Sequence, residues 1–260
     1  MNVLERIYAR KACATEDERA LLPEDRARDL ARASIPDRRG FLHALRSAPK
    51  PAIVAEIKRA SPSSGVIAQD VDVRTIARTY ETAGAAAISV LTERDHFLGD
   101  LSYLARVRSA TRLPILRKDF LWSSYHVAQS AACGADALLL IVAALSDDAL
   151  HTCLREAQRY ALDVLVEVHD EDELRRAVQA GAQLIGVNNR NLSTMSVDLA
   201  IGERLLPKVP AAIYALAESG MRQPSDAARM TASGADGLLV GEALMRSASP
   251  EAFIGAIRGR

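Results

Sequence analysis

A tripeptide with a central glycine recurs along this chain, each time just before an apolar run. The four copies are Ala83-Gly84-Ala85, Cys133-Gly134-Ala135, Ala180-Gly181-Ala182 and Ser233-Gly234-Ala235. A glycine after a helical stretch is typical of a helix C-cap, and a short apolar run after it is typical of a buried strand. The copies are spaced by about the length of two β–α units. The repeat therefore predicts a regular alternation of helices and buried strands.

Eight strands are predicted, four of them directly after these glycines. Those four cover residues 86–91, 136–142, 184–188 and 236–241, and the others cover 52–58, 113–118, 162–167 and 211–218. Near-continuous apolar strands belong to a parallel sheet that is covered on both faces. An open doubly wound sheet is the alternative, but no GxGxxG or P-loop follows the first strand. Eight short strands, each followed by helix-like sequence, favour a (βα)8 TIM barrel.

The first 48 residues differ from the rest of the chain. They are rich in Arg, Glu, Asp and Ala, with apolar residues at mostly helical intervals. We expect residues 1–48 to form a helical extension that precedes strand one. The hydrophobic content of 49% is ample for one large core, so we expect a single domain over residues 1–260.

Composition narrows the choice of partners. The formal net charge is +0 and the pI is about 7.0, so the chain lacks the excess positive charge that is typical of a protein that binds nucleic acid or an anionic membrane. The three cysteines form no CxxC pair, and the mixed charges of the N-terminus contain no signal-peptide core. We expect a cytoplasmic protein with no nucleic-acid or membrane partner, as a monomer or weak homodimer.

Polar side chains stand where the predicted strands end, which is where barrel enzymes place their chemistry. Side chains alternate along a strand, so Glu56 and Lys58 must point to the same side. An ion pair that serves only structure is the simplest alternative for two such residues. The complete set of strand-end residues is Glu56, Lys58, Lys118, Glu167, Asn188, Arg190, Glu218 and Ser219. Lysines and carboxylates that converge on one mouth shift each other's pKa values and suit proton transfer.

The loops after strands seven and eight have the composition of a phosphate site. Gly220 and Gly241 stand where backbone amides must approach an anion closely, and both precede sequence able to start a helix. Glu242 is unfavourable to a phosphate by charge, so we expect its contact to come from the backbone N–H. The substrate is therefore expected to be a small phosphorylated molecule.

Other reaction classes have little support in the sequence. The five histidines show no metal-ligand spacing, so we expect no metal. His169 is the one histidine that we keep as a candidate for a functional role, because it closely follows Glu167. No Ser-His-Asp arrangement or GxSxG elbow is present. Phe120 and Trp122 follow Lys118 and suit stacking on an aromatic substrate, although such residues are as often core.

Seven motifs resemble those of the indole-3-glycerol phosphate synthase family. They are EIKRASPSSG (56–65), SVLTERDHF (89–97), LPILRKDF (113–120), LVEVHD (165–170), IGVNNRNL (185–192), AESG (217–220) and LLVGEALM (238–245). The resemblance runs in order over nearly the whole chain. It implies a carboxy-lyase of tryptophan biosynthesis that converts 1-(2-carboxyphenylamino)-1-deoxyribulose 5-phosphate into indole-3-glycerol phosphate, CO2 and water without a cofactor.

The same resemblance implies a role for each site residue. Lys118 is expected to be the general acid for ring closure, Glu167 the base for dehydration, and Lys58 a substrate contact that delivers a late proton. Glu56 is expected to hold the lysines. Substrate positioning is expected from Asn188, Arg190, Glu218, Ser219 and Phe120, and phosphate binding from Ser61, Gly220, Gly241 and Glu242.

Two alternatives from other classes stay open at this point. A Schiff-base aldolase also places a lysine at a strand end, and borohydride would trap Lys118 or Lys58 only in that enzyme. A barrel that serves only as an assembly subunit is expected to lack Lys118, Glu167 or the phosphate glycines, yet all are present.

Overall fold

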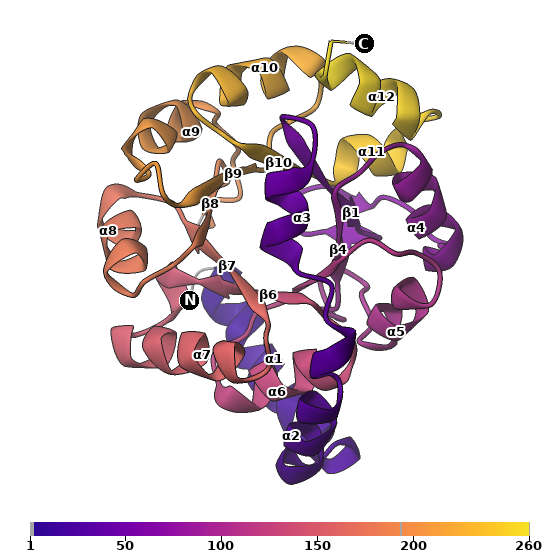
Figure 1. Ribbon diagram of the computed structural model, residues 1–260, viewed down its shortest axis with the longest axis vertical. Coiled ribbons are helices and arrows are strands. Elements are labelled where there is room, and N and C mark those ends of the chain that lie inside the picture. Colours follow the sequence, from indigo (N-terminus) through magenta and orange to yellow (C-terminus); the bar gives the residue numbers. More distant parts are fainter. Residues whose placement is uncertain (1–2, 193, 260) are drawn as a thin grey trace.

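Parallel strands close into a barrel in this protein. The computed structural model describes residues 3–192 and 194–259. Within these ranges, eight strands pair in parallel around the barrel, and β1 closes it by pairing with both β4 and β10 (Figure 1). They are β1 (Ala52–Ile57), β4 (Ala87–Leu91), β5 (Ile115–Lys118), β6 (Ala137–Ile141), β7 (Asp163–Val168), β8 (Leu184–Asn188), β9 (Tyr214–Glu218) and β10 (Gly237–Val240). The TIM barrel predicted from the sequence is confirmed.

Helices alternate with the strands and form the outer ring (Figure 1). They are α4 (Val73–Thr82), α5 (Ser102–Arg108), α6 (Ser124–Ala132), α7 (Asp147–Arg159), α8 (Glu171–Gln179), α9 (Ala200–Leu205), α10 (Pro224–Ala232), α11 (Glu242–Arg246) and α12 (Pro250–Ile257), with the 3-10 turns η2 (Val142–Ala144) and η3 (Leu206–Lys208). The four repeat glycines have φ values of 84° to 105° directly after α4, α6, α8 and α10. The predicted glycine caps are therefore confirmed.

Two segments differ from the sequence prediction. The strand predicted over 211–218 starts only at Tyr214, because Pro210 opens a turn that the Ile213 N–H closes. Between β1 and α4, where no strand is predicted, β2 (Ala60–Ser61) and β3 (Gly65–Val66) form a small antiparallel hairpin.

The hydrophobic core has two layers. The inner layer fills the barrel with inward side chains such as Val54, Leu116, Leu165 and Leu216. The outer layer lies between the strands and the helices. Side chains alternate along each strand, so the residues between the inner ones point toward the helices. Each barrel strand is thus buried on both faces, which explains its near-continuous apolar sequence.

The N-terminal extension consists of α1 (Val3–Leu21), α2 (Glu24–Ala33), η1 (Ile35–Asp37) and α3 (Phe41–Ser47). Helix α3 lies across one end of the barrel (Figure 1), where Phe41 and Leu45 are buried in the inner core. Helix α1 reaches the other end, where Leu4 and Ile7 line a cavity at the carboxyl ends of the strands. The extension therefore contacts both ends of the barrel.

Asp136 joins the extension to the amino ends of the strands. Its buried carboxylate accepts hydrogen bonds from the Arg39 N–H at 2.9 Å, from Arg108 Nη1 at 2.9 and 3.0 Å, and from the Ile115 N–H at 3.0 Å. A buried charge with this many partners is costly to remove, because its donors would lose their acceptor without access to water.

We expect Asp136→Ala to lower the free energy of unfolding by about 3 kcal/mol, since it leaves the partly buried Arg108 guanidinium without its carboxylate and two backbone N–H groups without an acceptor. The matched control is Asp172→Ala, which removes a carboxylate that is 85% exposed and forms an ion pair with Arg175. Chemical denaturation would measure both variants. Equal, small losses in the two would contradict a structural role for Asp136.

Candidate active site

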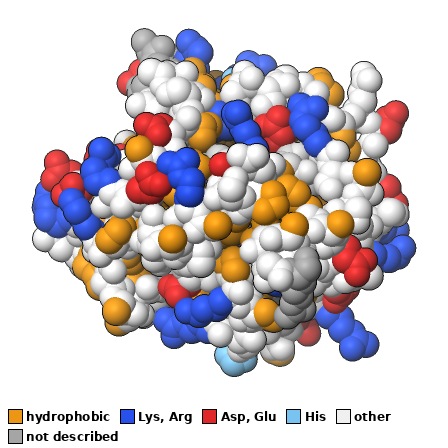
Figure 2. Space-filling model, turned by 90° about the horizontal axis from the view of Figure 1, so that it is seen from above, with side chains coloured by type: hydrophobic (Ala, Val, Ile, Leu, Met, Phe, Trp, Pro, Cys, Tyr) orange, Lys and Arg blue, Asp and Glu red, His pale blue; other side chains and the backbone are white. Residues whose placement is uncertain are grey.

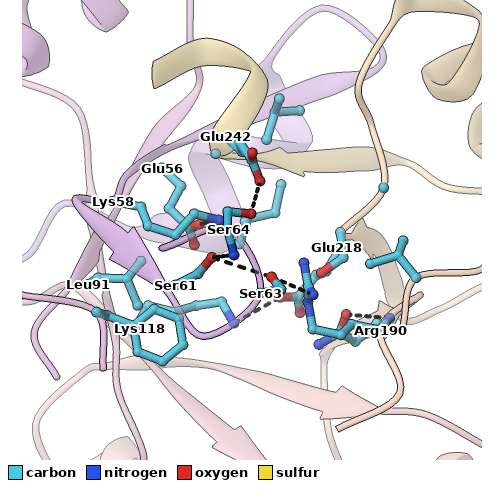
Figure 3. A pocket seen from close by; sticks show the side chains of 18 of the residues that line it. Glu56, Lys58, Ser61, Ser63, Ser64, Leu91, Lys118, Arg190, Glu218 and Glu242 are labelled. Carbon is cyan, nitrogen blue, oxygen red and sulfur yellow. Dashed lines mark hydrogen bonds and ion pairs between the residues drawn. The ribbon is translucent and has the colours of Figure 1, made fainter. Parts of the chain in front are cut away.

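The carboxyl ends of the strands open into a cavity of about 650 Å³. All thirteen residues predicted for the site line it, and Figure 3 shows several of them from close by. They are Glu56, Lys58, Ser61, Lys118, Phe120, Glu167, Asn188, Arg190, Glu218, Ser219, Gly220, Gly241 and Glu242. The structure thus brings the predicted residues together, while their individual roles stay predictions.

Strand alternation explains why these side chains meet. Lys118, Glu167 and Glu218 each stand two positions after an inner-core leucine of the same strand. A side chain two residues further along a strand points to the same face. The last inward position of β5, β7 and β9 is therefore charged, and it lies above the apolar layer of the barrel.

The ammonium group of Lys118 lies between two carboxylates. Its Nζ is 3.0 Å from Glu167 Oε2 and 3.1 Å from Glu218 Oε2. The lysine side chain is 15% exposed, and the two carboxylates are nearly inaccessible at 1% and 2%. In such surroundings charges interact several times more strongly than in water.

These contacts shift the pKa values of the lysine and of its first partner. Burial alone would lower the pKa of Lys118, but Glu167, Glu218 and Glu56 outweigh it and raise that pKa. Burial alone would raise the pKa of Glu167, but Lys118, His169 and a hydrogen bond from Asn188 lower it well below the usual range. Lys118 and Glu167 therefore form an ionised pair.

Glu218 differs from Glu167. Burial and the nearby charge of Glu167 raise its pKa to about 8, even though Lys118 acts in the opposite direction. At neutral pH Glu218 thus carries a proton, since one ammonium does not balance two carboxylates in a buried site. Room for its side chain comes from Gly186 on the neighbouring strand β8, where an added Cβ would lie only 3.1 Å from the Glu218 carboxyl carbon.

A second lysine–carboxylate pair lies beside the first. Lys58 Nζ is 3.0 Å from Glu56 Oε1, and Ser89 Oγ donates to Glu56 Oε2 at 3.4 Å. Gly241 leaves room for this pair, because a Cβ there would stand 3.1 Å from Lys58 Nζ. The predicted alignment of Glu56 and Lys58 on one side is confirmed.

Loop side chains close the rim of the cavity (Figure 3). Ser64 Oγ donates to Glu242 Oε2 at 2.8 Å, and Arg246 Nε donates to Glu242 Oε1 at 3.1 Å. Arg190 Nη1 donates to Ser63 Oγ at 2.9 Å. The rim thus ties the β2–β3 hairpin to the ends of β8 and β10.

Sequence reasoning missed several lining residues. Ser63 and Arg246 act on the rim but are not among the predicted site residues, although Ser63, like Ser64, stands inside the motif EIKRASPSSG. Gly186 stands inside the motif GVNNRNL and escaped notice because its role depends on the opposite strand. Trp122 does not contact this cavity; it packs against Tyr8 and His126 at centroid distances of 5.7 and 4.2 Å.

The fold and this arrangement of lysines and carboxylates define a barrel enzyme suited to proton transfer. The protein-family model described as indole-3-glycerol phosphate synthase matches residues 4–257. The chain belongs to the indole-3-glycerol phosphate synthase family. Its function is accordingly that of a carboxy-lyase of tryptophan biosynthesis acting on a phosphorylated small molecule.

Individual proteins with similar sequences have the same description as the family model. An indole-3-glycerol phosphate synthase from Chlorobium phaeovibrioides is 45% identical over 248 residues, which cover 95% of this chain and 96% of the relative. One from Azospirillum brasilense is also 45% identical over 248 residues, covering 94% of both chains. The crystal structure of 3-hexulose-6-phosphate synthase from Salmonella typhimurium has a TM-score of 0.65 at 15% identity, covering 80% of this chain and 97% of that one. This last likeness concerns the fold alone.

We expect Gly186→Ala to lower kcat by about 10²-fold, because the new methyl group displaces the Glu218 carboxyl from Lys118. The double variant Gly186→Ala/Glu218→Asp is the matched control, since the shorter side chain frees the space. Steady-state kinetics and circular dichroism would measure both variants. An unchanged kcat in the single variant would contradict the proposed close fit.

The raised pKa of Glu218 predicts a pH-dependent stability. The folded protein holds a proton that an unfolded glutamate releases near pH 4.3, so this contribution is complete below about pH 4 and is lost by about pH 8. Glu218→Gln cannot ionise. Its Tm relative to the wild type should therefore rise by several degrees between about pH 5 and about pH 8.5. A Tm difference that is the same at both pH values would contradict a neutral, buried Glu218.

Proposed function

We propose that Lys118 is the general acid and Glu167 the general base in the conversion of 1-(2-carboxyphenylamino)-1-deoxyribulose 5-phosphate into indole-3-glycerol phosphate, CO2 and water. The observation that supports this most directly is the Lys118 ammonium held between Glu167 and Glu218 at 3.0 and 3.1 Å. An acid and a base on different strands can act on different atoms of one substrate.

The reaction needs three proton movements. In ring closure the aromatic carbon that bears the carboxylate attacks the ketone carbon, and Lys118 protonates the ketone oxygen. Loss of CO2 then restores the aromatic ring. In the dehydration that follows, the new hydroxyl leaves as water with a proton, while Glu167 removes the proton that must go for the indole double bond to form. We assign the late proton delivery to Lys58, which Glu56 holds at 3.0 Å.

Lys118 is a better acid beside a protonated Glu218 than it would be beside an ionised one. A lysine that faces two charged carboxylates holds its proton too tightly to donate it. Because Glu218 is neutral at pH 7, the only full negative charge in direct contact with Lys118 among the described residues is that of Glu167. A substrate ketone that replaces a carboxylate contact would lower the pKa of Lys118 from this raised value.

The remaining site residues would hold the substrate. We assign the ring and hydroxyl groups to Asn188, Arg190, Glu218, Ser219 and Phe120, and the phosphate to Ser61, Gly220, Gly241 and Glu242. The Glu242 carboxylate is already held by Ser64 and Arg246. Its contact with a phosphate would therefore come from the backbone N–H, which leaves the negative charge directed elsewhere.

We further propose that the extension and the barrel form one domain, that the enzyme is cytoplasmic, and that it acts as a monomer or weak homodimer without cofactor or metal. Acidic and basic side chains alternate on the face in Figure 2, which is not the surface of a nucleic-acid binder. In the described ranges, no helix has the length and apolar character to span a membrane.

We expect Lys118→Ala to lower kcat by about 10²- to 10⁴-fold, because the ring-closure step loses its proton donor. Phosphate binding should persist, since the Gly220 and Gly241 loops are unaltered. Indole fluorescence would follow turnover, and titration calorimetry would follow substrate binding. A near-normal kcat would remove Lys118 from the acid role.

A further inference from the structure

His169 lies beside the proposed base without lining the cavity. It follows β7 directly, two residues after Glu167. Its Nε2 is 3.3 Å from Glu167 Oε1, and its Nδ1 is 2.9 Å from Glu173 Oε2. The imidazole thus stands between a carboxylate of the site and a carboxylate of helix α8. Its side chain is only 13% exposed.

The first turn of α8 places the Glu173 side chain next to this imidazole. Asp170 caps the helix by accepting from the Glu173 N–H at 2.8 Å. Glu173 Oε2 in turn accepts from the backbone N–H of His169 at 2.8 Å, in addition to the ring contact. Glu173 therefore holds both the backbone and the ring of His169 and keeps Nε2 on the side of the ring that faces Glu167.

The two oxygens of Glu167 face two different cations. Oε2 faces Lys118, and Oε1 faces His169. Lys118 is the group assigned to give up its proton during ring closure. When it does, the contact on Oε2 loses its positive charge, and the contact on Oε1 is unaltered.

We propose that His169, held by Glu173, is a positioning residue that keeps Glu167 ionised and fixes the orientation of its carboxylate while Lys118 exchanges its proton. This inference rests on the proposed role of Glu167 as the base. It adds two residues, His169 and Glu173, that do not line the substrate cavity and act only through Glu167.

His169 acts as a fixed cation rather than as a proton relay. Burial would lower its pKa, but Glu167 and Glu173 outweigh burial and raise that pKa to about 10. The pKa of Glu167 is lowered. Transfer of a proton from the imidazolium to Glu167 is strongly unfavourable with the two pKa values so far apart, so the positive charge stays on His169.

Other ionisable groups near Glu167 do not replace this charge. They come from four further elements or loops: Tyr8 on α1, Lys118 on β5, Arg190 after β8 and Glu218 on β9. Tyr8 and Glu218 are neutral near pH 7, because burial raises the pKa of each. Arg190 is directed to Ser63 and to the Met195 carbonyl by hydrogen bonds of 2.9 and 2.8 Å.

The charge on His169 can be measured without turnover. In protein labelled with ¹⁵N-histidine, the His169 signals are those lost in His169→Asn. We expect both ring nitrogens to remain protonated at about pH 8.5, and Glu167→Gln to lower the pKa of His169 by about 1 unit or more. A ring that loses its proton below about pH 7, or a pKa unaffected by Glu167→Gln, would overturn the inference.

The pH profile of kcat tests the consequence for the reaction. In His169→Asn we expect the acidic limb to move up by about 1–2 units and kcat at neutral pH to fall about tenfold, with KM nearly unchanged. Glu173→Gln should shift the limb in the same direction by less. Asp172→Asn removes a charge from the same helix turn and should shift nothing. A limb that stays in place in His169→Asn, with only Tm lowered, would show a purely structural residue.

A separate measurement keeps this inference distinct from the proposed function. Glu167→Gln should abolish most of kcat if Glu167 is the base. If that variant stays active, the assignment of the base fails, whereas the ¹⁵N titration still decides whether His169 and Glu167 form a charged pair.

Discussion

The contact on which this site depends is one buried ammonium shared by two carboxylates. Lys118 Nζ lies about equally far from Glu167 and Glu218, so the two acids compete for one positive charge. Water does not screen the excess charge, and the site resolves it by leaving Glu218 protonated. Two glutamates thereby acquire different properties: Glu167 is an ionised acceptor, and Glu218 is a neutral hydrogen-bond partner. The chemistry of the site follows from this division.

The barrel separates this costly arrangement from the groups that stabilise the fold. At the amino ends of the strands, the Asp136 carboxylate accepts hydrogen bonds from the Arg39 N–H and from Arg108, and α3 buries Phe41 and Leu45 in the inner core. At the carboxyl ends, charged residues replace the last inner-core side chain of several strands. Each of these residues comes from a different strand, so the barrel fixes their separation. Burying charged groups at the carboxyl ends of the strands costs free energy, and close packing at the amino ends offsets this cost.

Much of the fold was predictable because its signals are local. A glycine at the end of a helix and a short apolar run depend only on neighbouring residues, and the strand ends therefore followed to within a few positions. The convergence of Glu56, Lys118 and Glu167 also followed, because the ends of parallel strands meet in any barrel. The role of Gly186 did not, because it depends on the register between β8 and β9. The hydrogen bond from Ser64 to Glu242 was equally hidden, since it joins residues far apart in the chain.

The same distinction between local and distant contacts explains why His169 stood out early without an assigned role. The sequence shows that His169 follows Glu167 by two positions. Residues two positions apart point to the same face of a sheet, but only while the strand continues. Here β7 ends at Val168, and the chain turns into α8. That turn brings Glu173 to the far side of the imidazole and places Nε2 3.3 Å from Glu167 Oε1. The start of a helix on the outer ring of the barrel thus places His169, which together with Lys118 lowers the pKa of Glu167, outside the cavity.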